Sequence, residues 1–248
     1  MRSISRTRQQ LFVMMALACA LFAGFVAPTS VRAQMHVIMP AITETQQETP
    51  PTLAPSPAPA VHKEKALEDF PLNIALFRLV NNHRHYWLDC FFYLFANLGS
   101  GWVLLPVLLA AILWRRTKVY PFLVALAIES LLVGVAKHFF HQPRPEVYLD
   151  QVHSLLLPLR HNALPSGDTA MAFMLAIVFM ADERWPMRAA LLAYAVLIAY
   201  ERVYMGMHYP LDVVSGALIG IVSAWIALKI FTKKPPAPTG EETPAAEG

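Results

Sequence analysis

Lys137 and Arg144 are two cations separated by six residues in the stretch KHFFHQPRP. Pro143 and Pro145 lie on either side of the arginine and restrict its backbone, so Arg144 is expected to be held in place. Lysine supplies a point charge, and arginine supplies paired hydrogen bonds from a planar group. Together these two side chains suit the binding of one small polyanion.

A second group is Pro165-Ser166-Gly167-Asp168, which comes directly before an apolar run. Ser166 suits a helix N-cap, and Gly167 permits a close approach to the backbone. The free N–H groups of a first helical turn form an anion site, assisted by the helix dipole. Asp168 also fits a first turn as an acid. Taken alone, the stretch is equally explained as a simple helix start.

The third group contains Arg202, His208 and Asp212, with Pro210 at the expected first position of a helix. Asp212 lies four residues after His208, so both side chains fall on one helical face. An aspartate bonded to one ring nitrogen fixes the histidine tautomer and leaves the other nitrogen free to attack. A single histidine at a helix start is more often a cap or a surface residue.

Together the groups supply three cations, helix N–H groups and an oriented imidazole. Phosphoryl transfer needs these parts: positioning, neutralised oxygens and a nucleophile. The sequence has no acidic cluster typical of magnesium sites and no cysteine and histidine spacing typical of zinc sites. It therefore predicts a metal-independent reaction with no metal site and no cofactor.

The elements that position these residues are predicted to be membrane helices. Of the 248 residues, 56% are hydrophobic and only 15% are charged. The formal net charge of +3 is too small to indicate a nucleic-acid partner. We predict an all-α, polytopic membrane helical bundle with about five core transmembrane helices. The five apolar segments are residues 88–114 (interrupted at Gly99-Ser100-Gly101), 119–139, 167–181, 189–204 and 211–231.

The flanking segments differ in composition from this bundle. Residues 1–33 are predicted to be a signal peptide, with an uncleaved anchor as the alternative. Residues 34–69 form a proline-rich linker expected to be disordered, and 232–248 a disordered cytoplasmic tail. The membrane-embedded domain, 70–231, begins with a predicted amphipathic helix at the membrane surface. Its apolar spacing is carried by Leu72, Ala75, Leu76 and Leu79.

The basic residues predict the orientation. They gather between the first and second segments, between the third and fourth, and after the fifth, all on one side that the positive-inside rule makes cytoplasmic. These residues are Arg115, Arg116, Lys118, Arg184, Arg188, Lys233 and Lys234. The candidate site then faces outward, which predicts a multi-pass protein of a bacterial inner membrane with a periplasmic active site.

With these motifs, residues 70–231 resemble the type 2 phosphatidic acid phosphatase superfamily, which is related to bacterial acid phosphatases and vanadium haloperoxidases. The first family motif, Lys-x6-Arg-Pro, is complete from Lys137 to Pro145. The second, Pro-Ser-Gly-His, has Asp168 in place of its histidine. The third, Ser-Arg-x5-His-x3-Asp, has Glu201 in place of its serine.

The resemblance implies a role for each matched position. The phosphate would be held by Lys137, Arg144, Ser166, Gly167 and Arg202. His208 would attack phosphorus to form a phosphohistidine, and Asp212 would orient His208.

The position of Asp168 leaves the leaving-group acid open. The family histidine protonates the leaving group, whereas Asp168 among cations is expected to stay ionised. There are three alternatives. Asp168 is protonated only in the substrate complex, or His161 replaces it as the acid, or the leaving group departs without needing a proton. The last favours lipid diphosphates.

The predicted function is hydrolysis of lipid phosphate or diphosphate esters at the periplasmic leaflet. Candidate substrates are undecaprenyl diphosphate, lipid A, phosphatidylglycerol phosphate and phosphatidic acid. A lipid phosphotransferase with the same site, or a catalytically impaired phospholipid-binding protein, is the alternative. The partners are a lipid phosphate and the bilayer, and the sequence does not predict an oligomeric state. Glu129, inside a predicted span, is expected to have a structural role.

Overall fold

The computed structural model describes residues 70–155 and 162–231, and all regular elements in these ranges are helices. This confirms the all-helical fold class. The predicted signal or anchor segment, the linker, the tail and His161 lie outside the described residues. The helices are α3 (Pro71–Asn81), α4 (Tyr86–Phe95), α5 (Leu104–Trp114), α6 (Arg116–Phe140), α7 (Pro145–Tyr148), α8 (Gly167–Met180), α9 (Trp185–Tyr204) and α10 (Pro210–Phe231), with 3₁₀ turns at Ala96–Gly99 and Gly101–Val103.

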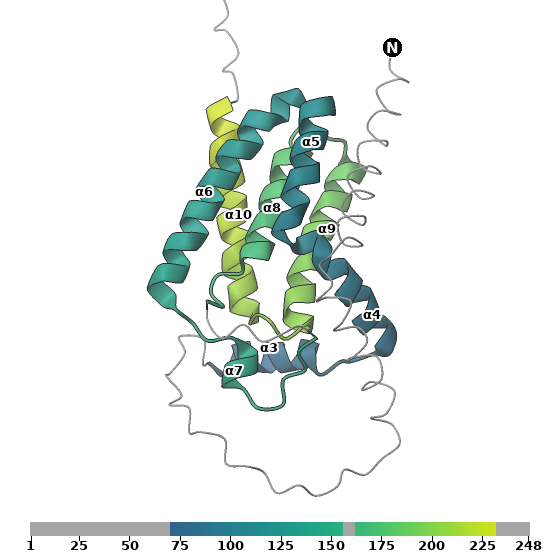
Figure 1. Ribbon diagram of the computed structural model, residues 1–248, viewed down its shortest axis with the longest axis vertical. Coiled ribbons are helices and arrows are strands. Elements are labelled where there is room, and N and C mark those ends of the chain that lie inside the picture. The colour runs from purple at the N-terminus through teal and green to yellow at the C-terminus, as the bar shows by residue number, and fades with distance from the viewer. Residues whose placement is uncertain (1–69, 156–161, 232–248) are drawn as a thin grey trace, which may run out of the picture.

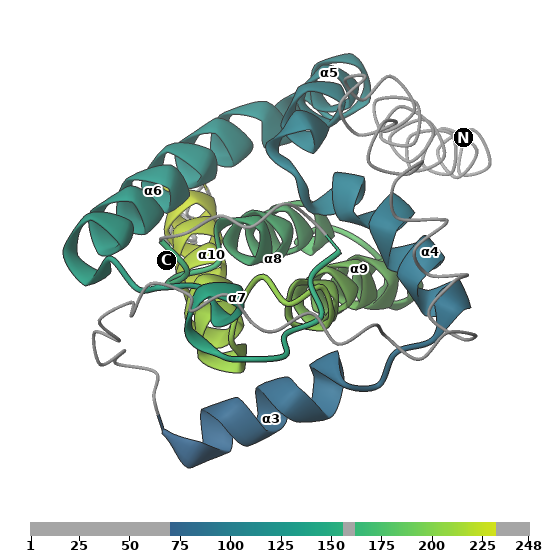
Figure 2. The same ribbon diagram turned by 60° about the horizontal axis from the view of Figure 1, so that its bottom comes forward.

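Helices α5, α6, α8, α9 and α10 run along the long axis of the bundle, while α3 and α7 lie across one end (Figure 1). Viewed towards that end, α8 lies inside the bundle (Figure 2). It packs against α6, α9 and α10. The end covered by α3 and α7 is therefore where the first turn of α8 can meet residues from its neighbours.

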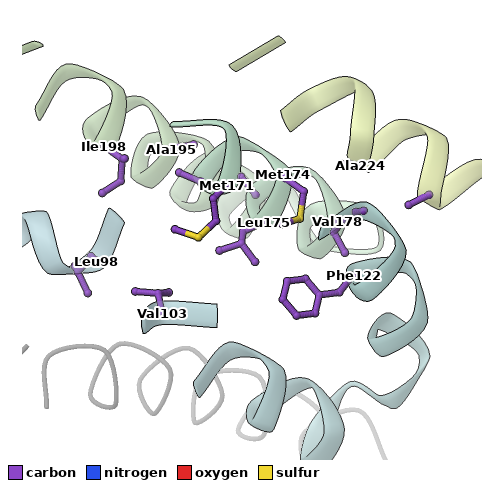
Figure 3. Packing of buried hydrophobic residues seen from close by; sticks show 14 residues of the cluster. Leu98, Val103, Phe122, Met171, Met174, Leu175, Val178, Ala195, Ile198 and Ala224 are labelled. Carbon is purple, nitrogen blue, oxygen red and sulfur yellow. The ribbon is translucent and has the colours of Figure 1, made fainter. Parts of the chain in front are cut away.

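The core is built around α8, a short helix that is apolar on all sides, as expected of a helix buried within a bundle. Met171, Met174 and Leu175 are buried on it and contribute to one cluster with residues of the surrounding elements (Figure 3). From those elements come Leu98, Val103, Phe122, Ala195, Ile198 and Ala224.

Helices α8 and α10 meet backbone to backbone. A Cβ added at Gly216 would lie 2.3 Å from the carbonyl oxygen of Ser166, and one added at Gly220 would lie 2.1 Å from that of Ala170. No side chain fits at these distances, so glycine is required at both positions. Small residues at helix contacts are typical of membrane bundles, because they let backbones approach closely.

The prediction of five spans is supported only in part. The stretches Arg116–Tyr148 and Pro210–Phe231 are long and apolar enough to cross a membrane, and the α4–α5 pair, bent by 53° at the predicted break, is a third candidate. Helix α8 has only 14 residues. Helix α9 has 20, but each 18-residue stretch of it includes the charges of Arg188, Glu201 and Arg202. Five spans thus remain a prediction.

The other end of the bundle carries two ion pairs that join the start of α6 to the α8–α9 loop. Arg115 pairs with Glu183, and the buried Lys118 pairs with Asp182. The hydrogen bond from Lys118 lowers the pKa of Asp182 below its ordinary value. Two of the basic residues that predicted a cytoplasmic side, Arg115 and Lys118, thus also connect α6 to the α8–α9 loop.

Helix α3 exposes an apolar face and buries a face that carries two asparagines. Leu72, Leu76 and Leu79 are exposed, whereas Asn73, Phe77 and Asn81 are buried. The predicted amphipathic helix is therefore present. Its leucine face points away from the protein, and its asparagines face the bundle.

Candidate active site

The three sequence motifs converge at the end of the bundle shown in Figure 2. Lys137 lies in the last turn of α6, Ser166 is the N-cap of α8, and Arg202 lies in the last turn of α9. His208 lies just before α10, and Asp212 in its first turn. Helix ends thus bring together residues from four elements that are far apart in the sequence.

His208 and Asp212 form a buried pair. Nδ1 of His208 lies 3.3 Å from Oδ2 of Asp212, and the backbone N–H of Tyr209 donates to the same oxygen at 2.8 Å. The second contact fixes the carboxylate, which in turn orients the imidazole. Burial lowers the pKa of His208 below 6.5, and the nearby Asp212 opposes this effect. A neutral imidazole with Nδ1 engaged leaves Nε2 as the nucleophilic nitrogen.

The N-cap of α8 is joined directly to this pair. The backbone N–H of Ser166 donates to the carbonyl of Asp212 at 2.9 Å. The Ser166 hydroxyl accepts from the N–H of Thr169 and lies 3.0 Å from the Thr169 hydroxyl. At Gly167, an added Cβ would lie 3.7 Å from Nζ of Lys137. The lysine ammonium therefore lies beside the first turn of α8, where N–H groups are available for an anion.

Arg144 follows α6 and is the N-cap of α7. Its side chain is buried, and Nη1 donates to the carbonyl of Met207 at 3.4 Å, directly before His208. Its buried Nε–H has no hydrogen-bond partner among the described residues. The guanidinium is thus fixed against the nucleophile loop with a donor left for an anion.

Arg202 is also buried, but two carboxylates contact it. Nη1 lies 2.8 Å from Oδ2 of Asp168, and Nε lies 2.7 Å from Oε2 of Glu201. The Glu201 contact is an ion pair without hydrogen-bond geometry. Nη2 donates to the carbonyl of Ala96 at 3.0 Å. Asp168, which stands at the position of the superfamily's leaving-group acid, is therefore found as a partner of a predicted phosphate ligand.

The sequence reasoning did not find Asn73 and Asn81 of α3. Oδ1 of Asn73 accepts from the N–H of Leu211 at 3.1 Å, in the first turn of α10. Nδ2 of Asn81 donates to the carbonyls of His153 and Tyr204, both at 2.9 Å. A signal was present: Asn73, Phe77 and Asn81 recur every four residues, on the face opposite the leucines.

His161 lies outside the described residues. Glu129 is buried and accepts a hydrogen bond from the Ser130 hydroxyl at 3.3 Å. Within 70–155 and 162–231, no three or more His, Cys, Asp or Glu side chains are grouped to hold a metal ion.

The assembled site can hold a tetrahedral anion between Lys137, Arg144 and the first turn of α8. An imidazole with a fixed tautomer lies at the same helix ends. Because catalysis of phosphoryl transfer depends mainly on positioning and charge neutralisation, this arrangement suits it.

Comparisons with known proteins agree with this chemistry. A family model described as PAP2 superfamily matches residues 118–236. The crystal structure of LpxE from Aquifex aeolicus is 51% identical, with a TM-score of 0.65, and covers 66% of this chain and 99% of that one. An undecaprenyl-diphosphatase of Sulfolobus acidocaldarius is 25% identical over 171 residues, 68% of this chain and 82% of the relative. A lipid A 4'-phosphatase of Bacteroides thetaiotaomicron is 38% identical over 64 residues, 25% of this chain and 28% of the relative.

Proposed function

This chain belongs to the PAP2 superfamily, and on that premise we propose that it is a membrane phosphatase that hydrolyses lipid phosphate or diphosphate esters through a phosphohistidine. The observation that carries the proposal is the buried His208–Asp212 pair beside the first turn of α8 and the two cations Lys137 and Arg144. The undecaprenyl-diphosphatase and the lipid A 4'-phosphatase among its relatives support a lipid substrate.

The reaction has two steps. Nε2 of His208 attacks phosphorus, forming a P–N bond while the P–O bond to the leaving group breaks. Water then attacks phosphorus, the P–N bond breaks, and inorganic phosphate leaves with His208 neutral again. Asp212 holds Nδ1 in both steps and stabilises the positive charge that the ring gains on attack.

The charge that develops on the phosphate oxygens is met by protein groups. Lys137, Arg144 and the N–H groups of the first turn of α8 surround the position of the phosphate, and Arg202 lies at its edge. Such preorganised donors supply the stabilisation that metal ions give in other phosphoryl-transfer enzymes. We therefore propose a metal-independent reaction.

The leaving group is proposed to be a phosphate of a lipid diphosphate. Oδ2 of Asp168 lies 2.8 Å from Nη1 of Arg202, so this carboxyl group is engaged in an ion pair and is poorly placed to donate a proton. Hydrolysis of a lipid monophosphate releases an alkoxide, which needs that proton. Hydrolysis of a lipid diphosphate releases the lipid monophosphate, which is stable without it. The lipid diphosphate named in the Sulfolobus relative is consistent with this preference.

We further propose that the site faces the periplasm from a bacterial inner membrane. The basic residues Arg115, Arg116 and Lys118 lie at the opposite end of α6 from Lys137. By the positive-inside rule, that end is cytoplasmic.

The test is phosphate release by the detergent-purified protein in the presence of EDTA. The lipids are undecaprenyl diphosphate, lipid A, phosphatidylglycerol phosphate and phosphatidic acid. His208→Ala should abolish release, whereas His83→Ala, an exposed histidine at the end of α3, should not change it. Undecaprenyl diphosphate should give the highest rate.

Three results would contradict the proposal. Phosphate release that persists in His208→Ala would show that His208 is not the nucleophile. Phosphate release that is lost with EDTA would show that the reaction depends on a metal ion. Radiolabelled phosphate that is recovered in a second lipid instead of in solution would replace hydrolysis with transfer.

A further inference from the structure

The two positions at which this chain departs from the superfamily's motifs meet at one side chain. Asp168 replaces a histidine and Glu201 replaces a serine, and both carboxylates contact Arg202, at 2.8 and 2.7 Å. With both carboxylates ionised, the guanidinium and its two partners carry a formal charge of −1. In this conformation Arg202 therefore offers no net positive charge to a phosphate.

The remaining edge of the guanidinium is also occupied. Nη2 donates to the carbonyl of Ala96 at 3.0 Å. It also lies beside the 3₁₀ turn, where a Cβ added at Gly99 would be 3.1 Å from it. Nε and Nη2 of Arg202 thus both have partners, Glu201 and the carbonyl of Ala96. A phosphate reaches Arg202 through Nη1, where the carboxylate of Asp168 lies.

The two carboxylates differ in their freedom to move. The side chain of Glu201 is 0% exposed, whereas that of Asp168 is 34% exposed and lies in the first turn of α8. Moving Glu201 away from Arg202 would leave a charge in the protein interior, at high cost. Asp168 can exchange Arg202 for water. The fixed partner is thus Glu201, and the displaceable one is Asp168.

We propose that Asp168 is a specificity-determining residue that competes with the substrate's phosphate for Arg202. This inference rests on the proposed function and deepens it. When a phosphate binds Arg202, the Arg202–Asp168 pair is replaced by an Arg202–phosphate pair of similar strength. The contact therefore adds little to the free energy of binding. A diphosphate carries a second charged group and so more negative charge for Lys137, Arg144 and the first turn of α8 to attract, which recovers the loss. Asp168 therefore disfavours monophosphates and also speeds release of the product, inorganic phosphate.

The experiment measures how tightly inorganic phosphate binds the full-length protein in detergent. The readout is the rise in unfolding midpoint with phosphate concentration, with sodium chloride added to keep ionic strength constant. Asp168→Asn and Asp168→Ala should both bind phosphate roughly five- to tenfold more tightly than the wild type, since a charge-assisted pair no longer competes. No catalytic activity is needed for this measurement.

Asp182→Asn is the matched control. It makes the same change of carboxylate to amide in an ion pair, with Lys118, at the other end of the bundle. Its affinity for phosphate should equal that of the wild type. An equal gain in Asp182→Asn would show a general effect of net charge and would overturn the proposal.

Two further outcomes would also overturn it. Unchanged or weaker phosphate binding in both Asp168 variants would show that Asp168 does not compete. Tighter binding in Asp168→Ala alone would show that the size of the side chain matters and its charge does not. As a kinetic check, the ratio of kcat/KM for undecaprenyl diphosphate over undecaprenyl phosphate should fall in Asp168→Asn.

Failure of this inference differs from failure of the proposed function. If the wild type hydrolyses lipid phosphates but the Asp168 variants bind phosphate no better, only the competition is wrong. If the variants bind phosphate more tightly but the wild type hydrolyses no lipid of the panel, the competition stands and the phosphatase is wrong.

Discussion

At the scale of single residues, the environment of His208 sets the pH range of the reaction. Burial lowers its pKa below 6.5, while Asp212 favours the protonated ring. The nucleophile must be neutral to attack. The loss of activity on acidification is therefore expected below pH 6.5, if protonation of His208 causes it.

Asp212→Asn should change both the rate and this pH dependence. Without the carboxylate, burial and the nearby Arg144 lower the pKa of His208 with only Asp168 opposing them, so this pKa falls further and the acidic limb of the kcat profile moves to lower pH. The tautomer is no longer fixed, so kcat should fall roughly a hundredfold or more. The measurement is phosphate release as a function of pH.

Asp150→Asn is the control, because Asp150 is exposed and lies in the loop after α7, where its backbone carbonyl accepts from Arg78 of α3. Its profile should match that of the wild type. An acidic limb that moves to higher pH in Asp212→Asn would contradict the role of Asp212.

The sequence predicted which residues gather at the helix ends, but it did not predict the individual side-chain contacts between them. Lys137, Ser166 and His208 lie at helix ends, and such ends can be located from proline, glycine and capping residues. The contact of Asp168 with Arg202 depends on how α8 and α9 pack, across 34 positions of sequence. Motif spacing carries no information on that packing.

At the scale of elements, the contact between α8 and α10 holds the anion site against the nucleophile. Gly216 and Gly220 allow this contact, because a Cβ at either position would lie within 2.3 Å of a backbone oxygen. Backbone atoms of two packed helices cannot give way as a flexible side chain can. The spacing between the helices is thus fixed by these two glycines.

Gly220→Ala should destabilise the protein by about 1–3 kcal/mol or more, because the added methyl group forces the helices apart. Gly134→Ala is the matched control: it lies in α6, where an added Cβ meets no atom within 4 Å. Alanine there should be neutral or stabilising by up to about 1 kcal/mol. Thermal unfolding in detergent compares the two, and equal midpoints would contradict the close packing.

Helix α3 also acts as an element, since its asparagines bind three backbone segments at the end of the bundle that carries the candidate site. Asn81→Ala removes hydrogen bonds to the carbonyls of His153 and Tyr204. These flank the loop that carries His208, so kcat should fall roughly three- to tenfold, as for loss of one or two buried hydrogen bonds. Asn82→Ala, at the exposed end of α3, is the control. An unchanged kcat in Asn81→Ala would show that α3 does not position the loop.

The positions of the helices were easier to predict from the sequence than the contacts that each helix makes with distant parts of the chain. The break at Gly99-Ser100-Gly101 and the amphipathic helix were both correctly located, because glycine and helical spacing are local signals. The contacts of Asn73 and Asn81 join positions 72 to 138 residues apart. No local pattern identifies such a partner.

At the scale of the whole molecule, the charged residues divide between two ends. The ion pairs of Arg115 and Lys118 lie at one end, and the His208–Asp212 pair lies at the other. A bundle arranged in this way can be oriented in a membrane by its basic end alone.

Cysteine labelling in intact cells tests this orientation. In a background without native cysteines (Cys19→Ser and Cys90→Ser), Asp150→Cys should react with a membrane-impermeant maleimide once the reagent reaches the periplasm. Arg184→Cys, exposed at the opposite end, should react only after the inner membrane is disrupted. The reverse pattern would place the active site in the cytoplasm.

The bond from the Ser166 N–H to the Asp212 carbonyl has a consequence for recombination between relatives. It joins two segments that are 46 positions apart, at the contact where Gly216 faces Ser166. A chimera that takes the Pro165–Asp168 stretch from one homologue and the start of α10 from another would combine surfaces that had not diverged together. Exchanging both segments as one unit should keep the fold and the activity, whereas exchanging either alone should impair both.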